Sequence, residues 1–131
     1  MSISIEISPG ELLDRISILS IKAKRLTDPQ KRAYMAAELR RLEALRSDAL
    51  VIDDHLRQLC QELESVNDEI WRLTDDVYRR RARGAIDVAL AKICLRAFEL
   101  NGDRSEIKRK IDAHLGAAIR EVKNYGDAVE A

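Results

Sequence analysis

Six residues in the second half of the chain have side chains suited to holding a polar ligand. They are Asn67, Trp71, Asp75, Asn101, Arg104 and Lys108. Asn101, Arg104 and Lys108 share one helical face, because they follow each other at spacings of three and four residues. Arg104 and Lys108 would donate hydrogen bonds to an anion, and Trp71 would supply an apolar wall. The pattern predicts a candidate pocket for a small anionic or polar ligand.

Arg104 is the most unusual of these residues, because it occupies an apolar position of its predicted helix. Ala97 and Ile111 stand seven residues before and after it on the same line. A cation at such a position needs a partner, since an uncompensated buried charge costs about 3–5 kcal/mol. Arg104 therefore belongs to an ion pair, a ligand site or both.

The two halves of the candidate site come together only if the chain reverses direction between them. Gly84 is the predicted turn, and pairing residues at equal distances from it places Asn67 opposite Asn101. The expected partners of Arg104 are then Glu64, Asp68 and Asn67. The alternative to a ligand pocket is a closed polar layer that fixes the register of the helices, and we favour this structural interpretation.

The chain carries no pattern that indicates catalysis, a metal site or a cofactor. His55 and His114 are isolated, and Cys60 and Cys94 have no second ligand at metal-binding spacing. No glycine-rich loop is present that would cradle a phosphate. We therefore assign no catalytic residue, no metal and no cofactor, and expect both cysteines to be free thiols in a reducing cytoplasm.

The N-terminal part predicts an extended arm over residues 1–7 and a short helix over residues 9–26. Ser8 is the expected N-cap, Pro9 takes the first helical position, and Glu11 completes the pattern of a capping box. Asp28 and Pro29 end this helix and start the next one.

Two long helices are predicted after it, over residues 29–82 and 86–123, with a loose tail over residues 126–131. Neither Gly nor Pro occurs from residue 30 to residue 83, and apolar residues recur there every seven positions, which is typical of a coiled-coil seam. This line comprises Met35, Leu42, Ala49, Leu56, Leu63, Ile70 and Val77. Weaker helix formers between Asp48 and Asp54 leave a bend open, but the unchanged register favours one continuous helix.

The predicted fold class is all-α, as a single domain. We expect an elongated antiparallel three-helix bundle, in which the short capped helix packs on a coiled-coil hairpin of the two long helices. Only 7 Gly and Pro residues in 131 argue against a turn-rich β-sandwich or barrel.

The charge composition argues against nucleic acid and membranes as partners. The 23 basic and 23 acidic side chains cancel, and no uncharged apolar run approaches the roughly 18 residues of a membrane span. One basic run, from Arg79 to Arg83, follows Asp75 and Asp76 by four residues. This spacing favours a salt-bridged helix end over a nucleic-acid surface.

Several short motifs of the chain resemble a family of small bacterial proteins catalogued only as a domain of unknown function. The resemblance runs from about residue 5 to residue 125, and its most specific block is residues 8–22, with the sequence SPGELLDRISILSIK. Further matching positions are Asn67, Trp71, Asp75, Asp76, Asn101, Arg104, Lys108, Ile111, Glu121, Lys123 and Tyr125. Thr74, Gly102, Asp112 and Asn124 depart from the family pattern. The resemblance implies a helical fold and no known activity.

Two functions from different classes are consistent with these features. The first, which we favour, is a non-catalytic helical interaction module that self-associates, most simply as a homodimer, or binds a protein partner through apolar seam left uncovered. The alternative is a protein that binds a small anionic metabolite, or an all-helical enzyme, with its site between the two long helices.

Overall fold

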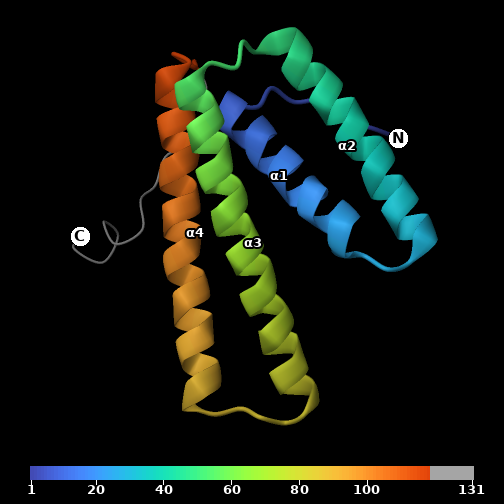
Figure 1. The fold of residues 1–131 in the computed structure, drawn as a ribbon, viewed down its shortest axis with the longest axis vertical. Helices are drawn as coiled ribbons and strands as arrows, with labels where there is room; N and C mark the ends of the chain where they lie inside the picture. Colours follow the sequence, from blue (N-terminus) through green and yellow to red (C-terminus); the bar gives the residue numbers. More distant parts are fainter. Residues whose placement is uncertain (119–131) are drawn as a thin grey trace.

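The computed structural model describes residues 1–118, and within them the chain is all-helical. The four helices are α1 (Pro9–Arg25), α2 (Pro29–Ala49), α3 (Asp54–Ala82) and α4 (Val88–His114). Residues 1–7 form no helix or strand. Figure 1 shows α3 and α4 as a long antiparallel pair, with α1 and α2 beside its upper part.

The prediction of one continuous helix over residues 29–82 is wrong, because the chain turns back between Ala49 and Asp54. Leu50 ends α2 in an extended conformation, and the carboxylate of Asp53 caps α3 by accepting a hydrogen bond from the backbone N–H of Leu56 at 2.8 Å. This hydrogen bond and the adjacent His114 hold the pKa of Asp53 below its ordinary value. The predicted three-helix bundle is therefore a four-helix arrangement.

The apolar line continues across this break because apolar residues of both helices are buried in the same core. Leu42 of α2 and Leu56 of α3 are both buried in one cluster with α1 and α4. A straight helix would carry the segment of α2 away from that cluster, whereas the turn lays it along α1 (Figure 1). Burial of the apolar side chains outweighs the continuity of the helix.

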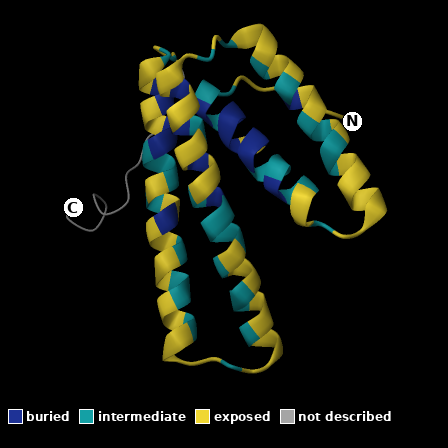
Figure 2. Cartoon of the chain, in the orientation of Figure 1, coloured by how far each residue is buried: buried dark blue, intermediate teal, exposed yellow. Residues whose placement is uncertain are grey.

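The core lies at one end of the α3–α4 pair. Its buried members are Leu12, Leu13, Ile16, Leu42, Leu56, Leu59, Leu63, Ile107 and Ile111. Beyond it no residue from 68 to 99 is buried, although this stretch is two facing helix halves and their turn (Figure 2). We call the four-helix end the head and residues 68–99 the hairpin arm.

The hairpin turn falls where the sequence predicts it. Gly84 adopts a φ of +71°, which side-chain-bearing residues rarely tolerate. Contacts across the hairpin follow the expected pairing, with Glu69 and Arg96 at 3.5 Å and Asp53 and His114 at 2.8 Å. The predicted ion pairs at its tip also form, from Arg79 to Asp75 and from Arg80 to Asp76.

Helix α4 ends earlier than the predicted boundary at residue 123. It stops at His114, and Gly116 follows with a φ of +61°, a left-handed conformation that ends helices. The last part of the predicted helix and the predicted tail over residues 126–131 lie outside the described residues. Among those described, no helix combines the length and the apolar content needed to cross a bilayer.

The first turn of α1 approaches α4 so closely that only glycine fits at the contact. A Cβ atom on Gly10 would lie 2.6 Å from the backbone oxygen of Lys108 and 2.8 Å from Oδ1 of Asp112. The backbone N–H of Gly10 uses this proximity and donates a hydrogen bond to the same carboxylate oxygen of Asp112 at 2.7 Å. Gly10 is therefore a packing residue of the head.

The variant Gly10→Ala should lower the free energy of unfolding by about 2 kcal/mol, because the added methyl group forces the two helices apart. The matched control is Gln30→Ala, at the equivalent, exposed position of α2. Urea denaturation of both variants measures the difference. Equal stability of the two variants would contradict the close-approach role of Gly10.

Candidate functional site

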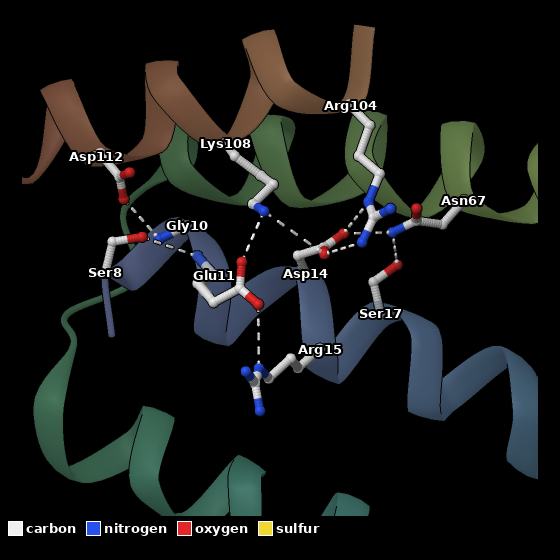
Figure 3. Close-up of polar contacts among 10 residues, drawn as sticks. All are labelled: Ser8, Gly10, Glu11, Asp14, Arg15, Ser17, Asn67, Arg104, Lys108 and Asp112. Atoms are coloured by element: carbon white, nitrogen blue, oxygen red, sulfur yellow. Dashed lines mark hydrogen bonds and ion pairs between the residues drawn. The ribbon is translucent and has the colours of Figure 1, made fainter. Parts of the chain in front are cut away.

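A buried polar layer joins α1, α3 and α4 in the head, and Asp14 of α1 is its centre. The side chain of Asp14 is 1% exposed. Its carboxylate accepts two hydrogen bonds from the guanidinium of Arg104, one of them from Nε to Oδ1 at 2.8 Å. Figure 3 shows this forked contact reaching from α4 to α1. Such pairing is what allows an aspartate to be buried in a helical core.

Asn67 of α3 completes the environment of this carboxylate. Its side-chain amide donates hydrogen bonds to Oδ1 of Asp14 at 3.0 Å and to Oγ of Ser17 at 3.2 Å. Asn67 is itself buried, so its donors need partners within the protein. The layer therefore takes one group or more from each of three helices and satisfies them mutually.

A second ion pair lies one turn closer to the start of α1. Nζ of Lys108 contacts Oε2 of Glu11 at 2.7 Å and stands 4.0 Å from Oδ2 of Asp14. The hydrogen bond from Lys108 lowers the pKa of Glu11, and Arg15 adds to this effect, while partial burial opposes it. These two cations take the Glu11 side chain, so the capping box is formed on one side only, by Ser8 Oγ accepting the N–H of Glu11 at 3.1 Å.

The predicted partners of Arg104 on α3 are wrong for both acidic residues. Glu64 instead pairs with Lys24 at 3.6 Å, and Asp68 pairs with Arg25 at 2.5 Å. The sequence prediction could not identify Asp14 as the partner of Arg104. It paired residues of the two long helices only and did not place the first helix against them. A signal was nevertheless present in the sequence. Gly10, Asp14, Ser17 and Ile21 share one face of α1, and all four are buried.

Next to the polar layer lies an open cavity of about 360 Å³, lined by residues of α1 and α3 and by Arg104 of α4. Four of the six candidate residues line it, namely Asn67, Trp71, Asp75 and Arg104. The other lining residues are Ile18, Ile21, Ile70, Thr74 and Tyr78. The surface of this cavity is predominantly apolar.

The other two candidate residues lie elsewhere. Lys108 belongs to the Glu11 ion pair and does not line the cavity. Asn101 is exposed, and its amide donates a hydrogen bond to the backbone carbonyl of Ala97 one turn earlier in α4. The candidate set is therefore divided between a cavity, a buried ion pair and a solvated surface.

The chemistry available at the cavity is that of an apolar recess beside a neutralised polar layer. An anion entering it would compete with Asp14 for the guanidinium of Arg104. Within residues 1–118, no cluster of three or more His, Cys, Asp or Glu side chains is arranged to hold a metal ion. Both cysteines are free, and burial raises the pKa of the Cys60 thiol.

Comparisons with known proteins return no match. No family model, no curated protein and no solved structure matches this chain. The resemblance to the uncharacterised bacterial family therefore stays a prediction, and function must be argued from the geometry.

The variant Arg104→Met should lower the free energy of unfolding by about 3 kcal/mol, because it leaves the carboxylate of Asp14 buried without its main partner. The double variant Asp14→Leu/Arg104→Met should recover most of this loss. A double-mutant cycle by chemical denaturation measures the coupling between the two side chains.

The control for this cycle is Arg72→Met, since Arg72 is exposed on α3 and its pair with Asp68 lies in solvent. It should remain close to the wild type in stability. Additive effects of the Asp14 and Arg104 substitutions would contradict the buried layer.

Stability should also fall in acid through Glu11. A carboxylate whose pKa is lowered in the folded state stabilises the fold above its ordinary pKa of 4.5, and this stabilisation is lost as the pH falls through the lowered value. The variant Glu11→Gln should therefore show a shallower decline of unfolding free energy below about pH 4.5. The control Glu6→Gln, in the exposed arm, should follow the wild-type profile, and an unchanged slope in Glu11→Gln would disprove this role.

Proposed function

We propose that this protein is a non-catalytic helical interaction module that self-associates through its hairpin arm. The observation that carries the proposal is the composition of the first half of α4. Residues 88–100 read VALAKICLRAFEL, in which Lys92, Arg96 and Glu99 are the only charged residues. A helix that is apolar on all sides is normally buried in a larger assembly.

Within the described chain most of this segment is not buried, and Leu100 at its end is the one residue in it that is. Val88 is 71% exposed, Leu95 61% and Phe98 73%. Tyr78 and Ile86, on the same arm, are also largely exposed. Exposed apolar side chains that gather in one region mark surfaces that bind another protein.

The head supports this role by holding the arm out in solvent. Helix α1 is fixed against α3 and α4 by Asp14 and its partners, and it ends at Arg25, beside Asp68. No other described helix reaches the arm beyond that point (Figure 1). The face of α3 that packs against α1 continues into the arm. Asn67 and Trp71 on this face line the cavity together with Ile18 and Ile21 of α1.

The alternative, a site for a small anionic metabolite, has weaker support. Arg104 and Lys108, the two proposed anion donors, both contact carboxylates of α1. The cavity wall is largely apolar and includes Asp75, which would repel an anion. We therefore propose an interaction surface in a cytoplasmic protein, with a homodimer as its simplest assembly.

The experiment is analytical ultracentrifugation over about 1 to 100 µM, where modest helical interfaces assemble. The wild type should show mass increasing with concentration. The double variant Leu95→Ser/Phe98→Ser should weaken association at least tenfold, because it removes two exposed apolar side chains from the proposed surface.

The matched control is Tyr34→Ser, which removes an equally exposed aromatic side chain from α2, outside the arm. It should associate as the wild type does. Circular dichroism confirms that each variant is folded. A wild type that stays monomeric at every concentration would overturn the proposal.

A further inference from the structure

We infer that the hairpin arm binds a second copy of this chain in antiparallel orientation, through the outer face of α4, with Lys92 of each copy paired with Glu99 of the other. This inference rests on the proposed self-association and adds to it the partner, the contact face and the register. Its evidence is the arrangement of apolar and charged residues around α4.

Helix α4 carries two apolar lines on opposite sides. One line, with Leu100 and Ile107, is buried against the rest of the molecule, and Ile93 continues it half-buried down the arm. The second line comprises Val88, Ala91, Leu95, Phe98 and Gly102, of which the first four are exposed and Gly102 is half-buried. Its intervals alternate between three and four residues, which is the pattern of a seam between two supercoiled helices.

The small and large residues of this second line fit a two-fold antiparallel pairing. A two-fold axis between Arg96 and Ala97 places Leu95 of one copy opposite Phe98 of the other, and Ala91 opposite Gly102. The bulky side chains then meet at the centre of the seam, and small residues on both sides let the helix backbones approach closely. Layers that combine an a position with a d position are what antiparallel coiled-coil packing requires.

A parallel pairing is disfavoured by charge. The seam continues at seven-residue spacing to Arg109, so parallel copies would place the two Arg109 side chains opposite each other. Like charges at facing core positions are repulsive and select against that orientation. In the antiparallel pairing Arg109 lies opposite the hairpin turn near Gly84 instead.

Lys92 and Glu99, the charged residues beside the seam, can pair with each other only across copies. Lys92 and Glu99 are seven residues apart and flank the second line on the same side. In an antiparallel pair this side of one helix faces the same side of the other, so Lys92 of one copy lies near Glu99 of its partner. Lys92 makes no ion pair among residues 1–118, and Glu99 is 67% exposed with one contact, to Arg96 at 3.3 Å on the same helix. Flanking pairs of this kind set orientation and partner choice in helical seams.

The size of the seam indicates a weak dimer. From Val88 to residue 105 it is about 27 Å long at 1.5 Å per residue. One helix pair of this length falls below the roughly 800 Å² per partner of a standard interface, so dissociation in the micromolar range is expected. The assembly would therefore depend on protein concentration.

The test exchanges the two charges. Lys92→Glu gives an arm with two acidic flanks, and Glu99→Lys gives one with two basic flanks, so each variant alone should dimerise at least tenfold more weakly than the wild type. The double variant Lys92→Glu/Glu99→Lys should dimerise as the wild type does. An equimolar mixture of the two single variants should form a heterodimer, which sedimentation of one fluorescently labelled variant detects.

A cross-linking measurement gives the orientation independently. In the antiparallel register Cys94 of one copy lies beside Asn101 of the other, so the variant Asn101→Cys should give a 94-to-101 cross-link between copies with a short bis-maleimide. The control Asn101→Cys/Cys94→Ser should not give this product. A parallel dimer would instead cross-link Cys94 to Cys94 in the wild type, and that product would overturn the antiparallel register.

The outcomes separate the inference from the proposed function. If the wild type associates and Leu95→Ser/Phe98→Ser does not, but the charge variants associate like the wild type, the Lys92–Glu99 register is wrong while self-association through the arm stands. If the wild type is monomeric, both fall. Restoration of dimerisation by the double charge variant supports both.

Discussion

The burial of one carboxylate is the constraint on which the head of this molecule depends. Asp14 is almost completely buried, where an unpaired negative charge would be strongly destabilising. Arg104 and Asn67 offset this cost, and each comes from a different helix. Sliding α1 by one turn would take Asp14 away from Arg104 and Asn67, so the polar layer opposes such a change of register.

The same constraint explains why α1 is the helix that packs against α3 and α4. Its first turn is held by Asp112 and Lys108, and the following turns by Arg104 and Asn67 (Figure 3). After Ile21 the contacts to α3 are ion pairs at the surface, such as Arg25 with Asp68. Helix α2 then needs only to cover the remaining side of α1. Among the four described helices, none packs as a third helix on the arm beyond Asn67.

Much of the fold was predictable because helices and their ends are recognised from local sequence patterns. The cap at Ser8, the turn at Gly84 and the apolar lines of α3 and α4 are all read from neighbouring residues. The break before Asp54 was not predictable in this way, since the heptad register continues across it and the gain from folding back comes from contacts with α1. The site was predicted in part for the same reason. Arg104 was conspicuous on an apolar line, but its partner Asp14 lies 90 residues away, where spacing along one hairpin carries no information.

The hairpin arm also divides the molecule into regions of different thermodynamic character. The head contains the buried core and the paired polar groups of the layer. The arm has no buried residue from 68 to 99, and its helices are held mainly by each other across the hairpin. Segments of this kind exchange their amide hydrogens through local opening, at a free energy well below that of the whole domain. A partner that covers the arm would therefore stabilise its folded form. The fraction of molecules in which the arm halves of α3 and α4 are helical would then rise with the concentration of that partner.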